Sequence, residues 1–331
     1  MPAIITHSFF AEDTLRNIKD LILKNEISSR IDLFYLGAQG PDIFFYYKAK
    51  PWIKYDGVEK LGTIMHENLV DTFFKNSFDY LDGLRGSTGF YDLLTYLAGY
   101  LCHYSLDRKT HPLIHYSAGI DNGLTKATRK YYNHHRRLES TIDYFSLLKR
   151  GIAPVSFKSF ELISTGKRFE PVLIDYYVSM LDKVYNTMIT PKQVTSAIHD
   201  ISSVLKNLYD PLGLKFLIYR LLELIMGTRD EITSSMIPRR LKNGMDYLNL
   251  DHRKWIHPCN AGYSSNESFW DLYDRALDEA DKFMNFISGY LKNGHFSNNI
   301  LDMTGNISYS TGIECGDSSE LKYFDSIYDQ V

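Results

Sequence analysis

The stretch TGFYDLLTYLAGYLCHYSLDRKTH occupies residues 88–111 and is more apolar than the segments before it. Its leucine and aromatic residues recur at helical spacing and lie on nearly every side of the expected helix. A helix that is apolar almost all round is buried in the protein. We therefore expect a central helix at about 88–109. His111 should lie at its end, because Pro112 disfavours the α conformation in the residue before it.

Three polar side chains interrupt this apolar helix at intervals of four residues: His103, Asp107 and His111. Each step of four rotates the side chain by about 40°, so the three share one narrow stripe of the helix. A single such residue is readily explained as a solvated or hydrogen-bonded side chain. Three in register on an apolar helix favour a metal site, in which a carboxylate between two imidazoles can bridge two ions.

A second pair with the same spacing, His135 and Glu139, lies on a helix expected at 124–149. Such a pair alone is a weak signal, because it also arises as an ordinary helix-stabilising pair. His134 projects about 100° away from His135 and is the poorer ligand. His115 either orients a ligand through a hydrogen bond or is near the first cluster by chance.

Three further candidates lie upstream: His7, Asp42 in Gly40-Pro41-Asp42, and His66. The Gly-Pro pair marks a turn or a helix start, so Asp42 is either a ligand or a helix cap. The complete set offers nitrogen and oxygen donors and no thiolate, which suits a cluster of Zn²⁺ ions with open positions better than a closed structural zinc. The predicted metal ligands are His7, Asp42, His66, His103, Asp107, His111, His135 and Glu139.

Helical periodicity dominates the rest of the chain, and alternation typical of strands is scarce. We expect an all-α, multi-helix bundle at 1–293 and a loosely packed segment at 294–331 that is richer in Asn, Ser and Gly. Further helices are expected at about 12–25, 60–82, 171–188, 191–208, 212–226 and 267–292.

The composition excludes several classes of protein. Hydrophobic residues make up 44% and charged residues 23% of the 331 residues, as in soluble globular proteins. A net charge of −3 argues against a nucleic-acid-binding surface. We expect no signal peptide and no transmembrane helix, because no apolar run is long enough. The three cysteines form no CxxC pair. Together these features favour the cytoplasm.

The motifs also occur in a recognisable order. An early His is followed by Gly-Pro-Asp-Ile-Phe, Met-His, His-Tyr-x-x-Asp, His-Pro and a helical His-x-x-x-Glu, all within 7–143. In this combination the chain resembles the zinc-dependent phospholipase C family, and in detail its cytoplasmic-type bacterial branch. The resemblance implies a phospholipase C/nuclease-like helical bundle around a cluster of three zinc ions.

The resemblance also implies which residues hold each ion. Asp42, His66, His103 and Asp107 would hold one zinc, and His111, His135 and Glu139 a second. His7 would contribute to a third together with a bridging Asp107. Secreted relatives complete that third site with an N-terminal tryptophan, which this sequence does not have, so we expect two or three ions. Asp42 would also act as the general base.

The function implied is hydrolysis of a phospholipid head-group ester to diacylglycerol and a phosphorylated alcohol. The basic-aromatic loop at 48–55 either touches a membrane surface transiently or is a packed turn. The alternatives are a nuclease-like or other soluble-phosphodiester hydrolase, and a non-catalytic, metal-stabilised helical binding protein. Zinc stoichiometry and activity on each substrate separate these possibilities.

Overall fold

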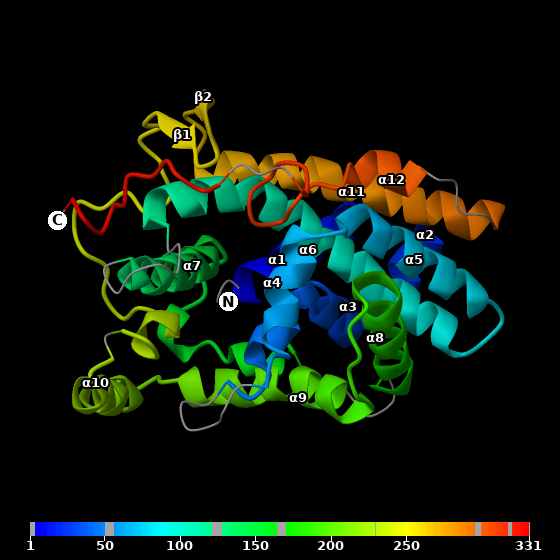
Figure 1. Ribbon diagram of the computed structural model, residues 1–331, viewed down its shortest axis with the longest axis horizontal. Coiled ribbons are helices and arrows are strands. Elements are labelled where there is room, and N and C mark those ends of the chain that lie inside the picture. Colours follow the sequence, from blue (N-terminus) through cyan, green and yellow to red (C-terminus); the bar gives the residue numbers. More distant parts are fainter. Residues whose placement is uncertain are drawn as a thin grey trace.

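The computed structural model describes residues 4–49, 56–120, 128–163, 170–228, 230–294, 299–316 and 320–330. Over these residues the chain is a helical bundle with one small two-stranded sheet (Figure 1), which confirms the all-α fold predicted from the sequence. The α-helices are α1 (Ile4–Asn17), α2 (Leu21–Ser28), α3 (Ile31–Gly37), α4 (Lys60–Glu67), α5 (Val70–Gly83), α6 (Gly89–Ala118), α7 (Arg129–Lys149), α8 (Glu170–Tyr185), α9 (Pro191–Leu208), α10 (Leu214–Met226), α11 (Phe269–Asn293) and α12 (Asn299–Thr304). The short elements are the 3-10 helices η1 (Gly40–Tyr46), η2 (Pro154–Ser156), η3 (Ser159–Glu161) and η4 (Thr233–Ser235), and the strands β1 (Trp255–His257) and β2 (Asn260–Ser265).

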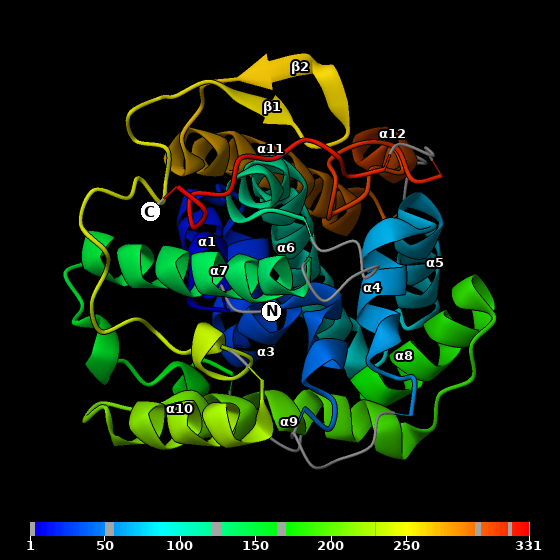
Figure 2. The same ribbon diagram turned by 60° about the vertical axis from the view of Figure 1, so that its left-hand side comes forward.

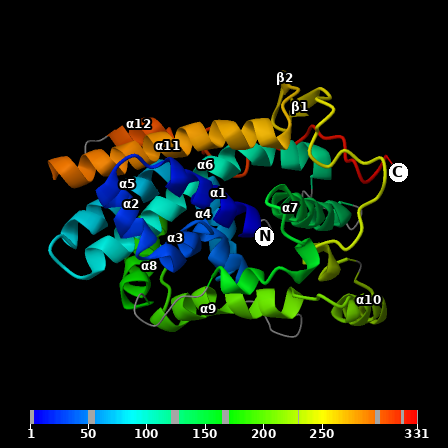
Figure 3. The same cartoon turned by 180° about the vertical axis from the view of Figure 1, so that it is seen from behind.

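The apolar stretch forms the central helix of the fold, as predicted. α6 is buried along most of its length and runs beside α11 (Figures 1 and 3). α3 crosses α6 with the two backbones in contact. A Cβ atom on Gly99 would lie 2.2 Å from Phe34 O, and one on Gly37 would lie 2.1 Å from Tyr96 O. This close approach, which only glycine permits, brings the segment after α3 against the ligand stripe of α6.

The predicted end of this helix is wrong. α6 continues through Pro112 to Ala118, so His111 lies inside the helix and not at its end. Proline removes one helical hydrogen bond, the one to the carbonyl four residues earlier. Leu113 and Ile114, which follow Pro112, are both buried. Burial of these side chains offsets the lost bond, and the ligand register therefore extends to His111 without a break.

Two helices predicted as continuous are each divided into two. The segment 12–25 is broken between α1 and α2, where the Asp20 side chain accepts a hydrogen bond from Leu23 N and caps the second helix. The segment 60–82 is broken before α5, where Leu69 adopts a left-handed conformation with φ of 53°. The second break leaves His66 in the last turn of α4. α1 begins at Ile4, earlier than predicted.

The remaining helices follow the prediction more closely. α9 spans 191–208 as expected, with Pro191 in its first turn and a capping box formed by Thr190 and Gln193. α8, α10 and α11 begin and end within about three residues of the predicted bounds. Residues 124–127 of the helix predicted at 124–149 lie outside the described residues. No described helix combines the length and apolar character needed to cross a membrane.

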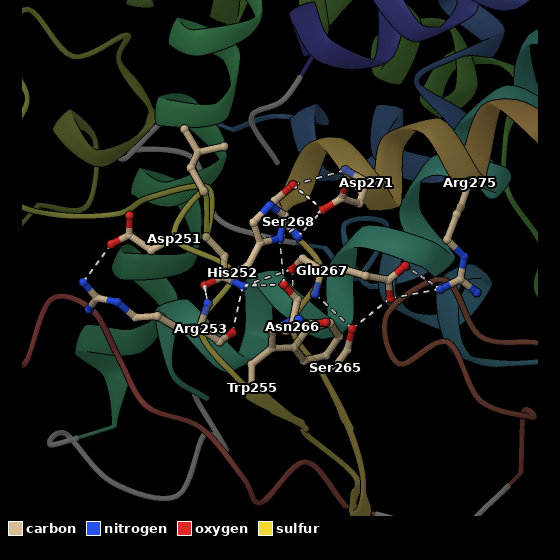
Figure 4. A network of polar contacts seen from close by, with 12 residues as sticks. Asp251, His252, Arg253, Trp255, Ser265, Asn266, Glu267, Ser268, Asp271 and Arg275 are labelled. Atoms are coloured by element: carbon tan, nitrogen blue, oxygen red, sulfur yellow. Dashed lines mark hydrogen bonds and ion pairs between the residues drawn. The ribbon is translucent and has the colours of Figure 1, made fainter.

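The β1–β2 hairpin is attached to the start of α11 by a network of polar contacts (Figure 4). Trp255 Nε1 donates to Glu267 O at 3.0 Å, and the Glu267 carboxylate lies 2.8 Å from Arg275 of α11. Ser268 and Asp271 form a capping box at the first turn of α11.

Beyond α11, Tyr309 and other side chains are buried. The domain division at residue 294 stays a prediction.

Candidate metal centre

Five helical elements bring the eight predicted ligands into one region of the molecule. α1, η1 and α4 each contribute one residue, α6 contributes three and α7 two. Figure 2 shows α1 and α6 behind α7, with α4 to the right of α7. The residues are His7, Asp42, His66, His103, Asp107, His111, His135 and Glu139.

Asp107 lies at the middle of this region. Its Oδ1 atom is 3.1 Å from His7 Nε2 and 3.5 Å from His111 Nδ1, and its Oδ2 atom is 3.1 Å from His103 Nε2. Oδ2 also lies 3.5 Å from His66 Nε2. One carboxylate thus faces four imidazoles, two of them on its own helix at the i−4 and i+4 positions that share its face.

The segment between α3 and α4 folds against the first turn of the ligand stripe because of a glycine. Gly40 has a φ of 52°, and a Cβ atom there would lie 2.2 Å from His103 Cδ2. The η1 helix that starts at Gly40 presents Asp42, whose Oδ1 lies 3.2 Å from His66 Nε2. The Gly-Pro-Asp motif therefore places a carboxylate opposite the two imidazoles of α4 and α6.

Backbone carbonyls fix the orientation of two imidazoles. His66 Nδ1 lies 2.7 Å from Gly62 O, and His103 Nδ1 lies 3.2 Å from Ala38 O. A carbonyl can only accept, so in each contact Nδ1 carries a proton and Nε2 is the nitrogen left to bind a metal ion. Both Nε2 atoms point at carboxylates, which is the arrangement of metal-ligating histidines oriented by an outer hydrogen bond.

A second group forms where the end of the α6 stripe meets α7. His135 Nε2 lies 3.1 Å from Glu139 Oε1, and His111 Nε2 lies 3.5 Å from the same oxygen. The rings of His111 and His135 are stacked, with centroids 5.6 Å apart. His111 also faces Asp107 through its other nitrogen, so the second group adjoins the first.

The ligand atoms form three sets within 4.8 Å, each large enough to hold a metal ion: His7, His103 and Asp107; Asp42, His66 and His103; and His111, His135 and Glu139. His103 belongs to the first two sets. The resemblance implies that His103 and Asp107 bind the same ion as Asp42 and His66. In the structure His103 and Asp107 also form a set with His7. The number of ions stays a prediction.

The electrostatics of the cluster suit a cation. Burial opposes ionisation of Asp107, but the imidazoles of His103, His111 and His7 outweigh it and hold the pKa of Asp107 well below its usual range. Burial disfavours a proton on His66, yet Asp107 and Asp42 raise the pKa of His66 to about 10. The buried carboxylates therefore require positive charge beside them, which a divalent ion supplies in place of protons.

Buried polar atoms without hydrogen-bond partners also indicate an ion site. His7 Nδ1, His103 Nε2, Asp107 Oδ2 and His111 Nδ1 are buried without a well-directed hydrogen bond. Buried polar groups normally have partners, and an ion is one explanation for those that have none. The donor set contains only nitrogen and oxygen, so the residues present fit Zn²⁺.

The sequence reasoning missed the contribution of the C-terminal segment. Tyr309 N and Ser308 Oγ both donate to His66 O, at 3.0 and 3.1 Å. The Tyr309 ring packs against His66 and His103, with centroids 5.1 and 5.8 Å away. These contacts hold the end of α4 in place. Nothing in the local sequence around 308–309 signals them.

Asp143 holds the start of α1, the helix that carries His7. Its carboxylate accepts from Thr6 N at 2.8 Å, from Thr6 Oγ1 at 2.6 Å and from Ile5 N at 3.3 Å. The first N–H groups of a helix have no partner within the helix, and an acceptor there stabilises the helix start. Asp143 lies one turn beyond Glu139 on α7, so α7 both carries a predicted ligand and fixes the helix that carries His7.

The segment at 48–55, predicted to be a surface loop, lies mostly outside the described residues. Of the part that is described, Lys48 N donates to Asp200 Oδ2 at 2.9 Å, and Lys48 Nζ lies 2.8 Å from Asp56 Oδ2. The two interpretations of this loop therefore stay predictions.

His115 lies beside the second group, with its ring centroid 4.9 Å from that of His135 and 5.8 Å from that of His111. Burial and the neighbouring imidazoles hold the pKa of His115 well below its usual value, so the ring is neutral. His115→Asn is expected to weaken zinc binding by roughly tenfold while leaving the number of bound ions unchanged. A zinc titration against a competing chelator measures both.

His134→Asn is the matched control, because its ring packs on Tyr328 and its Nδ1 faces Ser326, away from the second group. Loss of a whole zinc equivalent in His115→Asn would instead make His115 a ligand. Equal affinities in both variants would remove it from the site.

The comparison with known families agrees with this geometry. The model of the family described as zinc dependent phospholipase C matches residues 6–187, more than half of the chain. All eight predicted ligands lie inside the matched region. No curated protein and no solved structure shows a significant match. The chain belongs to the zinc-dependent phospholipase C family.

Proposed function

We propose that the protein hydrolyses the head-group phosphodiester of a phospholipid, giving diacylglycerol and a phosphorylated alcohol. The observation that carries this is the adjacency of two carboxylate–imidazole groups through Asp107 and His111, whose facing atoms lie 3.5 Å apart. Adjacent ions can bind different oxygens of one phosphodiester. Membership of the family supports the lipid as substrate.

In this proposal Asp42, His66, His103 and Asp107 bind one zinc, and His111, His135 and Glu139 bind another. His7 binds a third ion together with Asp107. When bound, zinc offsets negative charge on the phosphodiester oxygens and lowers the pKa of water. The carboxylates and imidazoles of α1, η1, α4, α6 and α7 would hold the ions that bind the phosphodiester.

Asp42 is the proposed general base. Its side chain is 12% exposed, against 4% for Asp107, so water reaches Asp42 more readily than the central carboxylate. Burial opposes its ionisation, but the hydrogen bond with His66 and the nearby imidazole of His103 lower the pKa of Asp42, which keeps it ready to take a proton. We also propose a cytoplasmic location, which the three free thiols support.

Removal of zinc tests the proposal. Purified protein is expected to release phosphocholine from phosphatidylcholine, to lose this activity in chelator and to recover it when Zn²⁺ is restored. Elemental analysis of the active preparation is expected to find two or three zinc ions. The loss should be close to complete, because an unassisted phosphodiester hydrolyses extremely slowly.

The competing functions predict different results in the same preparation. Cleavage of single-stranded DNA or RNA in a gel assay, with no release from lipid, would identify a nuclease. Full zinc occupancy without hydrolysis of any diester, lipid or soluble, would indicate a metal-stabilised binding protein. A preparation that retains full activity after zinc has been removed would contradict the metal-dependent reaction itself.

A further inference from the structure

The α10 helix presents its apolar residues to solvent. Its sequence is LKFLIYRLLELIM, and every leucine, isoleucine and methionine in it is exposed. Leu217, Leu221 and Leu224 are between 58 and 77% exposed. Figures 1 and 2 show α10 at the edge of the molecule, beside α9. Soluble proteins rarely expose a contiguous apolar patch of this kind unless it binds something.

Polar contacts on its other side hold α10 in this orientation. Lys215 Nζ donates to Lys206 O at 2.9 Å, and Tyr219 Oη donates to Asn207 O at 3.2 Å. Glu223 is buried, and its carboxylate accepts from Thr233 N at 2.8 Å and from Ile232 N at 2.6 Å.

Residues 215, 219 and 223 follow each other at intervals of four and so form the inward stripe of the helix. A surface helix normally has the opposite arrangement, with its apolar stripe inward. The fold therefore fixes α10 with its polar side towards the protein and its apolar side outward.

A cavity lies beside α10. Phe216 lines this cavity, which has a volume of about 70 Å³. The same cavity is also lined by Ile5, Tyr46, Arg136 and Asp143. Two of these residues are linked to predicted ligands. Tyr46 lies in η1 together with Asp42, and Asp143 holds the start of the helix that carries His7. A molecule bound at α10 is thus next to a cavity whose lining includes residues of α1, η1 and α7, three of the elements that carry predicted ligands.

Charge near the first turn of α10 favours an anionic surface. Lys206 and Arg239 lie beside this turn, since Lys206 O accepts from Lys215 Nζ of α10 and Arg239 Nη1 donates to Pro211 O at 3.0 Å. The nearest carboxylate, Asp210, accepts from Gly213 N and Phe216 N and so caps the helix. An apolar helix face with basic residues at its edge is the pattern of helices that lie in a membrane interface.

We propose that α10 docks the enzyme on a phospholipid surface, with its leucine face in the apolar layer and the basic residues at the head groups. The inference rests on the proposed function, in that the docked surface would contain the substrate. It assigns the membrane contact to α10, which lies far along the chain from the 48–55 loop.

Vesicle co-sedimentation tests the docking surface. The variant Leu217→Gln, Leu221→Gln and Leu224→Gln keeps helix propensity and removes apolar side chains only from the outward face. The zinc-loaded variant is expected to bind vesicles of equimolar phosphatidylcholine and phosphatidylglycerol roughly tenfold or more weakly than the unmodified protein. Hydrolysis of a soluble chromogenic phosphocholine diester is expected to be unchanged, because none of the three leucines lines the cavity.

The matched control replaces three exposed leucines elsewhere, Leu21, Leu148 and Leu250, which are between 46 and 71% exposed. This variant is expected to bind vesicles normally. A direct measurement needs no loss of function: Leu221→Trp should show a blue shift of its fluorescence when vesicles are added, relative to the same addition to the unmodified protein.

Docking by α10 would be overturned if the glutamine variant and the unmodified protein bind vesicles equally, or if the unmodified protein binds no vesicles. It would also be overturned if the unmodified protein is a dimer, the glutamine variant is a monomer, and both bind vesicles. The last result would make α10 a contact between two copies of the chain. Vesicle binding that depends on α10, in a protein inactive on every diester, would contradict the proposed function and support the docking surface.

Discussion

Replacing Asp107 with asparagine is expected to reduce kcat/KM for a soluble phosphodiester by roughly a thousandfold, even with excess zinc. Four imidazoles face the Asp107 carboxylate, and its atoms join the set containing His7 to the one containing His111. Asparagine keeps the shape but removes the negative charge and one acceptor oxygen. At least one zinc ion should be lost with it, as measured by elemental analysis of the purified variant.

Asp92→Asn is the matched control, because Asp92 is a buried carboxylate of the same helix that pairs with Arg30 and not with the cluster. Asp92→Asn should lower stability and leave zinc content and kcat/KM close to normal. If the two variants bind the same number of zinc ions and have equal activity, Asp107 does not bridge the sites.

The ligand stripe of α6 is predictable from sequence because spacing alone determines which residues of a helix share a face. The same reasoning finds His135 and Glu139 on α7. It places the end of α6 wrongly, because the local preference of the residue before Pro112 is weaker than the burial of the residues after it. Local rules predict well which residues share a face of a helix, and they predict helix ends poorly.

Contacts between distant segments are the part that sequence does not reveal. Tyr309 and Ser308 hold His66 across more than 240 residues, and Asp143 holds the start of α1 across 137. No spacing rule connects such pairs. The outward face of α10 is also not predictable from sequence. Its leucines alone suggest a buried helix. The polar side chains that face the protein are recognisable only from their contacts with distant residues.

Gly40→Ala is expected to have the largest effect on stability, because it strains the backbone and the metal centre together. The left-handed conformation at φ 52° disfavours any side chain, and the new Cβ would overlap the His103 ring, which is fully buried. Together the two costs are expected to lower the free energy of unfolding by roughly 2 to 5 kcal/mol. Chemical denaturation of the zinc-loaded and metal-free protein measures the change in each state.

Gly57→Ala separates the two costs. Gly57 has a φ of 94°, but a Cβ there meets no atom of the described residues within 4 Å, so this variant should lose only the conformational part, roughly 1 to 2 kcal/mol. Equal losses at both positions would show that the His103 ring moves aside freely. His103 contributes to two of the three candidate metal sets. A displaced ring should therefore weaken zinc binding as well, and Gly40→Ala should destabilise the zinc-loaded protein more than the metal-free protein.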